Sequence, residues 1–467
     1  MQFYRVPELE KILYLKLIIW HFLENFVKMR HLTKGDFMLI QFSVKNWRSI
    51  RKEQTLSLVM AKGDELAASN SFKCVAPATT NLLRSLAIYG ANASGKSNVI
   101  NAMKTMENIV LESASKWQQG DHIPVVPFLL DSDTENEPSE FETIFIAEGV
   151  RYQYGFSATP ERIIEEWLLA YPVGRAQRWF SRVWDNDTNY YSWEFGNALT
   201  GQKQLWQEST RENGLFLSTA VQLNSQQLKP IYDWFKKSLR FADTSLLGPE
   251  FTADLCQKEE KKKEVLAFLK AADLNIDNLV VETEKFSVKH LPDDIPDDTK
   301  RTILAKMKDN EVFDIKTIHH STQGKLITFD FDEESEGTQT LFSVAGPWLD
   351  TLQNGFVLFI DELHNNLHPK IVEFLVQLFH SNVTNPNNAQ LIFTTHETSI
   401  LSQDIFRRDQ IWFCEKDKDQ ATQLYPLTDF SPRKGREKIE ASYLAGRYGA
   451  LPYTRDLKLV KEAQGGD

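Results

Sequence analysis

The residues from Gly90 to Ser97, GANASGKS, have the types and spacing of a phosphate-binding loop. In the pattern G-x-x-x-x-G-K-S, backbone N–H groups turn toward one point, and a lysine and a hydroxyl side chain stand beside it. We expect Lys96 to contact the β- and γ-phosphates of a nucleotide and Ser97 to ligate Mg²⁺. The chemistry indicated is the binding of ATP together with its magnesium ion.

The segments on either side of this loop suit a phosphate site. Leu86–Tyr89 is a short apolar run that predicts a buried strand, and Asn98–Lys104 is compatible with a helix. The N-terminus of such a helix favours an anion through its dipole and its N–H groups. A chance glycine turn before a helix is the alternative, and this context argues against it. The residues that we expect to contact the nucleotide are Gly90, Asn92, Gly95, Lys96, Ser97 and Asn98.

A second apolar run, Phe356–Ile360, ends in two carboxylates. A continuous apolar run is expected of a central parallel strand that is buried on both faces. Asp361, at its tip, is placed to hold the Mg²⁺ of a bound nucleotide. Glu362, directly after it, is placed to polarise the attacking water. Together with the upstream loop, this pair predicts ATP hydrolysis.

A third apolar run, Gln390–Thr395, ends in His396. The phosphate loop, the Asp-Glu strand and the strand-terminal histidine occur in an order that resembles the ABC-type ATPase heads of the RecF, SMC and OLD group. The resemblance implies that His396 senses the γ-phosphate. A surface histidine at the end of a strand is the simpler alternative, and the order of the motifs disfavours it.

Two further segments match this group less closely. Glu334–Gln339 stands where ABC-type ATPases carry their signature loop, so the resemblance implies that Ser335 and Gly337 contact the γ-phosphate held by the opposite subunit. The usual form is closer to L-S-G-G-Q, and Glu336 departs from it. Phe42–Ser49 looks like the N-F-[KR]-S strand, which would make Arg48 a nucleotide contact. An exposed arginine on an edge strand is an equal alternative.

Other segments suggest a subgroup. Leu363–Pro369 resembles the loop that follows the Asp-Glu pair in OLD-like ATPases. Arg407–Trp412 and Gly446–Pro452 look like the ends of AAA/OLD-like ATPases from bacterial phage-defence loci. The similarity runs from about Met38 to Pro452. It implies an ATP-dependent dimer or higher homo-oligomer that acts as a nucleotide-driven switch on a separate effector protein.

The alternative function is that of a RecF- or SMC-like ATPase that acts on DNA. The chain has 53 basic and 64 acidic residues, a net charge of −11. This balance argues against a broadly basic surface that binds nucleic acid. It does not exclude a local basic groove. Three scattered cysteines, Cys74, Cys256 and Cys414, favour a reducing compartment, so we expect a cytoplasmic protein.

The nearest candidate for a transmembrane helix lies in the N-terminal segment. Residues 12–23 are interrupted by Lys16 and His21 and fall short of the ~20 apolar residues that a span requires. We therefore expect no membrane partner. The ATPase resemblance begins at Met38, and Lys34–Asp36 can be encoded by purine-rich codons that resemble a ribosome-binding site. We interpret residues 1–37 as an N-terminal extension, which would result if the translation start had been assigned upstream of the true one.

The expected fold is an α/β P-loop NTPase of ABC-head type. Residues 38–200 would form the N-terminal half of the head with an antiparallel β subdomain, because two strand-like runs flank a Glu148-Gly149 turn. Residues 201–315 read as a helical insertion. Residues 316–467 would complete the head with the signature, the Asp-Glu strand and His396. The glutamine of the ABC Q-loop stays open between Gln118, Gln119 and Gln153.

No constellation in the chain suggests a nuclease. About seventy residues follow His396, too few for the C-terminal Toprim domain of OLD-family nucleases. The pair His319-His320, and His364 with His368, could suggest a metal site. For the second pair a packing role at a dimer interface is the better interpretation, because Pro369 and the loop context argue against a helix face. Destructive chemistry, if present, would lie on a partner chain.

Overall fold

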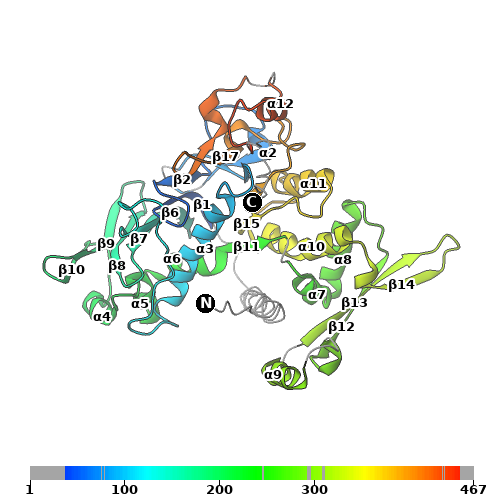
Figure 1. Ribbon diagram of the computed structural model, residues 1–467, viewed down its shortest axis with the longest axis horizontal. Coiled ribbons are helices and arrows are strands. Elements are labelled where there is room, and N and C mark those ends of the chain that lie inside the picture. The colour runs from blue at the N-terminus through cyan, green and yellow to red at the C-terminus, as the bar shows by residue number, and fades with distance from the viewer. Residues whose placement is uncertain are drawn as a thin grey trace, which may run out of the picture.

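The computed structural model describes residues 37–452, apart from residues 75, 78, 245–246, 292–295, 308–310, 434 and 436. The proposed extension, residues 1–37, and the apolar run 12–23 lie outside this range except for Phe37. The described chain is an α/β structure in which an antiparallel sheet and a mostly parallel sheet lie on either side of a central helix (Figure 1). The expected α/β P-loop NTPase fold with an antiparallel β subdomain is confirmed.

The mostly parallel sheet carries the three motifs that were expected to bind ATP. Its strands β11, β15, β16, β5 and β17 run parallel, and β18 pairs antiparallel with β17. In spatial order the strands are β11 (Leu239–Asp243), β15 (Val357–Asp361), β16 (Gln390–Thr395), β5 (Ser85–Tyr89), β17 (Ile411–Lys416) and β18 (Thr422–Pro426). Because parallel strands end at the same edge, the residues that follow β5, β15 and β16 come together there.

Both faces of this sheet are buried, which explains its continuous apolar runs. On β5, Leu86 and Ile88 belong to the core shared with α3 (Lys96–Glu112). The alternate residues Ala87 and Tyr89 belong to a second core, which also holds side chains of α10 and α11. The helices of that second core are α7 (Glu250–Cys256), α8 (Glu259–Ala271), α10 (Glu336–Asn354), α11 (Pro369–His380) and α12 (Ile439–Leu444).

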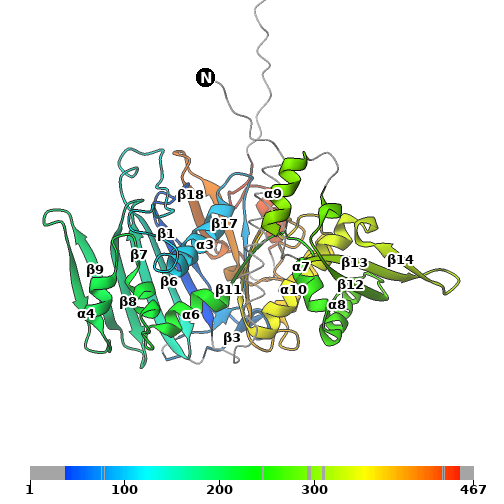
Figure 2. The ribbon, with the colours of Figure 1, turned by 90° about the horizontal axis from the view of Figure 1, so that it is seen from below.

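The antiparallel sheet forms the other layer, at the left of Figure 2. Its spatial order is β10 (Tyr190–Phe195), β9 (Gln177–Asp185), β8 (Ile163–Tyr171), β7 (Val150–Ala158), β6 (Ser139–Ala147), β1 (Met38–Lys45) and β2 (Gln54–Ser57). Glu148 and Gly149 join β6 to β7 with φ of 50° and 74°. Positive φ at both central residues is the mark of a two-residue hairpin turn, as the sequence predicted.

Helix α3 lies between the two sheets and shares the larger core with both. Helices α5 (Phe216–Gln222) and α6 (Lys229–Ser238) pack beside it. Glu166 of β8 is fully buried and accepts bonds from the backbone N–H groups of Phe216 (2.7 Å) and Leu217 (3.0 Å). It is also ion-paired with buried Arg182 at 3.0 Å. This carboxylate therefore anchors the start of α5 to the antiparallel sheet, since it satisfies N–H groups that a helix leaves free.

The segment 201–315, expected to be a helical insertion, differs from that expectation. It holds α4 (Lys203–Ser209) through α9 (Asp297–Met307), but also β11 of the central sheet, the strand β12 (Asn278–Lys285) and the first half of β13 (Glu311–His320). With β14 (Leu326–Asp330) the last two form a separate antiparallel sheet that projects from the body (Figures 1 and 2). The five residues of β11 were missed because a strand this short between helical runs gives little periodicity.

The remaining elements are short connections. They are α2 (Ala67–Asn70), β3 (Ser71–Phe72), β4 (Leu82–Leu83), and the 3-10 helices η1 (Val288–His290), η2 (Phe331–Glu333), η3 (Arg408–Gln410) and η4 (Leu427–Phe430). Cys74, Cys256 and Cys414 are all buried. Among the described residues, no helix combines the length and the apolar character that a membrane crossing needs.

Candidate functional site

The loop Gly90–Ser97 joins β5 to α3, as the sequence predicted. Close packing against β17 and β18 explains both of its glycines. A Cβ at Gly90 would lie 2.2 Å from the carbonyl oxygen of Cys414, and one at Gly95 would lie 2.1 Å from Thr422 Oγ1. Gly95 also has φ of 107°, which other residues rarely adopt. No larger side chain fits at either position while the strands stay in place.

Lys96 is only 7% exposed, and its ammonium group lies inside this loop. It donates to the carbonyl oxygens of Gly90 (2.8 Å) and Ala91 (3.0 Å). Burial lowers the pKa of Lys96, and the Asp361 and Glu362 carboxylates partly oppose this shift. A buried cation is suited to an anionic group that enters the loop, and the two carboxylates near it are suited to a metal ion that accompanies such a group.

A cavity of about 380 Å³ opens over the loop. Glu362 reaches it from the end of β15, so the cavity joins two motifs that lie far apart in the sequence. The residues that line it are Ser49, Asn92, Ala93, Ser94, Gly95, Lys96, Ser97, Asn98, Glu362 and Lys416. Six of the expected site residues therefore line one cavity: Asn92, Gly95, Lys96, Ser97, Asn98 and Glu362. Gly90 does not line it and packs against the backbone of Cys414 at the start of the loop.

Thr394 of β16 holds the carboxylate of Asp361 and the backbone of Glu362 in place. Its buried hydroxyl donates to Asp361 Oδ1 and accepts from the backbone N–H of Glu362 at 2.9 Å. Glu362 has φ of 53°, a left-handed conformation that turns the chain directly after the strand. The side-chain amide of Asn365 donates to Glu362 Oε2 at 2.7 Å. These bonds orient Glu362 toward the cavity and leave one oxygen of each carboxylate available.

The donor set fits the magnesium ion that the sequence implies. Ser97 is exposed at the cavity, and Asp361 has one oxygen that Thr394 does not hold. Mg²⁺ prefers oxygen ligands, and it is usually held by one or two protein groups together with phosphate oxygens and waters. A hydroxyl and a carboxylate are thus a sufficient protein contribution.

His396 follows β16 and is exposed, as expected for a residue that could meet a phosphate. It does not stand alone. The ring of His364, from the loop after Glu362, lies with its centroid 3.7 Å from that of His396, with an angle of 62° between the ring planes. His364 Nδ1 is 3.2 Å from Thr395 Oγ1. The sequence indicated a packing role for His364 but gave no sign of this ring contact.

Ser335 and Gly337 are not in the cavity of their own chain. Ser335 is the N-cap of α10 and accepts the backbone N–H of Thr338 at 3.2 Å. Gly337 packs on the loop after Glu362, since a Cβ there would lie 3.4 Å from the carbonyl oxygen of Asn366. The start of α10 and the loop that carries Glu362 and His364 are therefore in contact.

Comparison with known families adds to this geometry. Residues 85–402 match the family described as "AAA domain, putative AbiEii toxin, Type IV TA system". The chain belongs to this family. The matched segment begins at the first residue of β5 and includes the phosphate loop, the Asp-Glu pair and His396. The prediction of a P-loop ATPase is confirmed, and membership of such a family is consistent with ATP binding. No curated protein matches the chain.

Solved structures with similar folds include ATPase heads. The SMC head domain from Thermotoga maritima has 11% identity and a TM-score of 0.37, with 83% of this chain and 98% of that chain covered. A structure of the recombination mediator RecF with ATP has 13% identity and a TM-score of 0.36, covering 84% and 100%. At this level of similarity, neither says what this AAA-domain chain binds.

Arg48 does not line the cavity, and the next residue does. The Arg48 side chain is exposed and lies over the ring of Trp47, 4.8 Å from its centroid, while its backbone N–H donates to the carbonyl of Val126. Ser49 lines the cavity and accepts from Asn98 Nδ2 at 2.7 Å. The segment singled out in the sequence thus reaches the site one residue later than expected.

Lys416 also lines the cavity and was missed. It comes from β17, which lies beside β5 although more than three hundred residues separate them in the chain. Its ammonium donates to the carbonyl of Gln420 at 2.8 Å. No local motif surrounds Lys416, so only the strand order could have located it.

None of the candidate Q-loop glutamines lines this cavity. Gln118 and Gln119 are exposed in the segment between α3 and β6. Gln153 lies on β7, where it donates to Glu142 and accepts from the hydroxyl of Tyr171, both at 2.9 Å. The structure therefore does not choose among them.

The paired histidines at the end of β13 are held by carboxylates. His319 Nε2 lies 2.7 Å from Glu334 Oε1, and its Nδ1 lies 3.1 Å from the carbonyl of Asn275. His320 pairs with Asp277 at 2.6 Å. Within the described ranges, no group of three or more histidine, cysteine or acidic residues is arranged to hold a metal ion.

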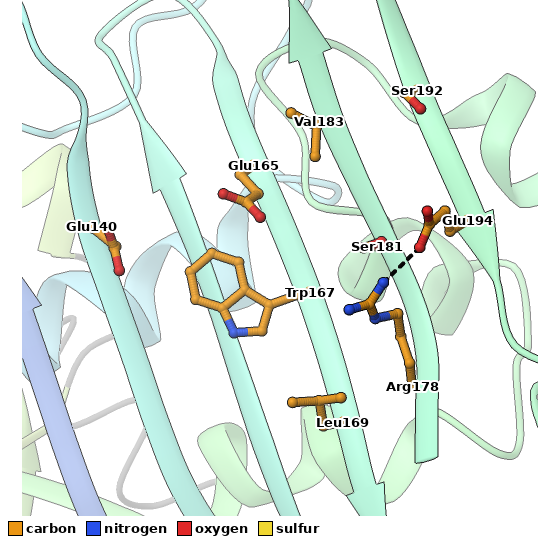
Figure 3. A pocket seen from close by; sticks show the side chains of 9 residues that line it. All are labelled: Glu140, Glu165, Trp167, Leu169, Arg178, Ser181, Val183, Ser192 and Glu194. Atoms are coloured by element: carbon orange, nitrogen blue, oxygen red, sulfur yellow. Dashed lines mark hydrogen bonds and ion pairs between the residues drawn. The ribbon is translucent and has the colours of Figure 1, made fainter. Parts of the chain in front are cut away.

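A second cavity of about 450 Å³ lies on the antiparallel sheet (Figure 3). Trp167 lies at its floor, over Gly155, where an added Cβ would clash with the ring at 2.3 Å. An ion pair of 2.6 Å joins Arg178 to Glu194 at one side. The residues that line it are Glu140, Glu165, Trp167, Leu169, Arg178, Ser181, Val183, Ser192 and Glu194. It shares no residue with the cavity over the phosphate loop.

Proposed function

We propose that this AAA-domain chain binds and hydrolyses ATP with Mg²⁺ and works as a nucleotide-driven switch. The observation that carries the proposal is the presence of Glu362 in the same cavity as Gly95, Lys96 and Ser97. A carboxylate beside a phosphate loop has the position of a base that activates water. A loop that only bound phosphate would not require it.

Each residue has a distinct role in the proposed reaction. Lys96 and the loop N–H groups bind the β- and γ-phosphates, and Ser97 and Asp361 ligate Mg²⁺, which neutralises phosphate charge. Glu362 orients and deprotonates the water, held in position by Asn365. His396 contacts the γ-phosphate.

We also propose that two chains close around ATP. Ser335 and Gly337 lie outside their own cavity, at the start of α10. A helix N-terminus with a serine cap is a suitable anion contact for a second copy of the chain. In that arrangement each cavity is completed by the partner's Ser335 and the partner's Gly337. Closure therefore depends on the γ-phosphate.

The switch would act on a separate effector protein. The family description refers to type IV toxin–antitoxin systems, which supports a two-component arrangement of this kind. Phage defence is the setting that we propose. Expression of the chain with the product of the neighbouring open reading frame should alter cell growth or phage resistance in a manner that depends on Glu362.

The central experiment measures phosphate release from ATP by the purified chain, with and without Mg²⁺, over a range of protein concentrations. We expect Mg²⁺-dependent hydrolysis that rises more than linearly with concentration until the dimer saturates. A folded protein that neither binds nor hydrolyses ATP would contradict the proposal. Duplex and single-stranded DNA are added in parallel, because strong, salt-sensitive stimulation would favour the DNA-directed alternative.

A further inference from the structure

The loop after β15 and the end of β16 bring two histidines together. β15 and β16 are parallel neighbours, so the residues that follow them emerge at the same edge. The rings of His364 and His396 meet there edge to face, with 3.7 Å between centroids. His396 is exposed, whereas His364 is partly buried between it and the core.

We infer that His364 is a positioning residue that fixes the orientation of the His396 ring. The inference rests on the proposed function, in which His396 contacts the γ-phosphate. An exposed side chain at the end of a strand has several rotamers, and contact with a fixed ring restricts them. His364 itself would touch neither nucleotide nor water.

The hydrogen bonds of His364 fix its own ring. Thr395 is fully buried, and its hydroxyl oxygen accepts the backbone N–H of Glu397 at 3.0 Å. His364 Nδ1 lies 3.2 Å from this same hydroxyl oxygen, within hydrogen-bond distance. Nε2 is buried and has no hydrogen-bond partner among the described residues.

The electrostatic surroundings keep His364 neutral. Burial, with a smaller contribution from His396, lowers the pKa of His364 to about 4. The titratable groups that face it are His396, Glu362, Glu397 and Lys96. At neutral pH the ring therefore adds no charge beside His396 and can serve as a fixed, uncharged surface.

The backbone of this loop is tied to β16 as well. The N–H of Leu363 donates to the carbonyl of Thr394 at 3.1 Å, and Leu363 is fully buried. Glu362 is held from the same loop by Asn365. His364 thus shares a loop with the group proposed to activate water and contacts the group proposed to sense phosphate. A shift of this loop would therefore affect both.

A double-mutant cycle tests whether His364 acts through His396. We expect His364→Ala and His396→Ala each to lower kcat with little change in KM, by up to about 10²-fold, since misplacement near 1 Å can cost this much. In the His396→Ala background, His364→Ala should change kcat by less than about twofold. Multiplicative effects would overturn the inference.

Two further variants separate positioning from folding. His364→Phe keeps a ring against His396 and should retain more activity than His364→Asn, which keeps a polar group without the ring. The matched control is His122→Ala, an exposed histidine between α3 and β6. A result in which Asn preserves activity better than Phe would contradict the ring contact.

A measurement that is independent of ATPase activity uses protein labelled with ¹³C at histidine Cε1. The His396 resonance is assigned by its loss in His396→Ala. It should shift in His364→Ala, because a ring 3.7 Å away affects its environment, and not in His122→Ala. An unmoved resonance would overturn the inference even in an active protein. A shifted resonance in a protein without ATPase activity would support it while the proposed function fails.

Discussion

The cavity over the phosphate loop and the cavity on the antiparallel sheet are similar in size and differ in construction. The cavity over the phosphate loop is about 380 Å³ and that on the antiparallel sheet about 450 Å³. The first draws its lining from separate parts of the chain, including a helix N-terminus, a strand end and a neighbouring strand. The second is lined by side chains of four strands in one sheet. Volume alone therefore does not distinguish a site.

The charges sharpen this difference. Lys96 and Lys416 face Glu362 across the first cavity, a combination suited to a phosphate with its metal ion. The second cavity holds Glu140, Glu165 and Glu194 against one arginine. Burial raises the pKa of both Glu140 and Glu165. A cavity in which three carboxylates stand against one arginine is poorly suited to the anionic phosphates of a nucleotide.

The largest effect is expected at the phosphate loop. Lys96→Ala should abolish ATP binding, because the phosphates lose the buried cation of the loop, while the fold is retained. Calorimetric titration with ATP and circular dichroism would measure the two properties. Lys116→Ala, which removes a half-exposed lysine paired with Glu112 outside the cavity, is the matched control. Retained affinity in a folded Lys96→Ala protein would show that the cavity is not the phosphate site.

The next largest effect is expected at Glu362. Glu362→Gln keeps the shape of the carboxylate and the Asp361 ligand but loses the base, a role worth about 10²–10⁴-fold in rate. ATP should still bind, and the ATP-closed dimer should accumulate. Steady-state turnover and ATP-dependent sedimentation measure these outcomes. A turnover close to that of the wild type would mean that another residue activates the attacking water.

The sequence predicted the parts of the site that lie in continuous motifs. The loop, the Asp-Glu strand and His396 follow from local patterns, because the strand order of a parallel sheet brings their ends to one edge. Lys416 joins the cavity through β17, a segment with no motif of its own, whereas Ser49 belongs to the segment Phe42–Ser49, in which the resemblance had pointed to the neighbouring Arg48.

The predicted fold was right where strands were long or paired by a tight turn, as in β6 and β7. It was incomplete in residues 201–315, where β11 is too short to show a period and pairs with a strand far along the chain. The ring contact of His364 with His396 also depends on strand order, so no spacing in the sequence could predict it.

A smaller effect on ATP hydrolysis is expected from a substitution of Thr394, the residue of β16 that bonds to Asp361 and to the backbone of Glu362. Thr394→Val removes the bonds to Asp361 and to the N–H of Glu362 without changing the side-chain volume greatly. Groups that orient a metal ligand are worth about 10- to 100-fold in metal affinity or activity. We expect a higher Mg²⁺ requirement and slower hydrolysis, measured by titrating Mg²⁺ at saturating ATP.

Thr351→Val is the control for Thr394→Val. Thr351 is equally buried, and its hydroxyl has no hydrogen-bond partner among the described residues. Replacing it should leave the Mg²⁺ dependence unchanged. Equal effects from the two substitutions would mean that Thr394 contributes packing and not the orientation of Asp361.

The smallest effect is expected in the second cavity, at Glu165. Glu165→Gln should leave ATP binding and hydrolysis unchanged and should raise the melting temperature slightly at neutral pH. Burial holds the pKa of Glu165 above its usual value in the folded chain. The folded state therefore binds the proton more tightly than the unfolded state, and wild-type stability falls as pH rises through the interval between the two pKa values.

The pH dependence of this gain separates the carboxylate from other causes. Well below the unfolded pKa, near 4.5, Glu165 is protonated in both states, so the advantage of glutamine should vanish there. Thermal unfolding of both proteins across this range is the measurement. A gain that persists in acid would come from packing beside Trp167, and a loss of ATPase activity would mean that the second cavity is linked to the first.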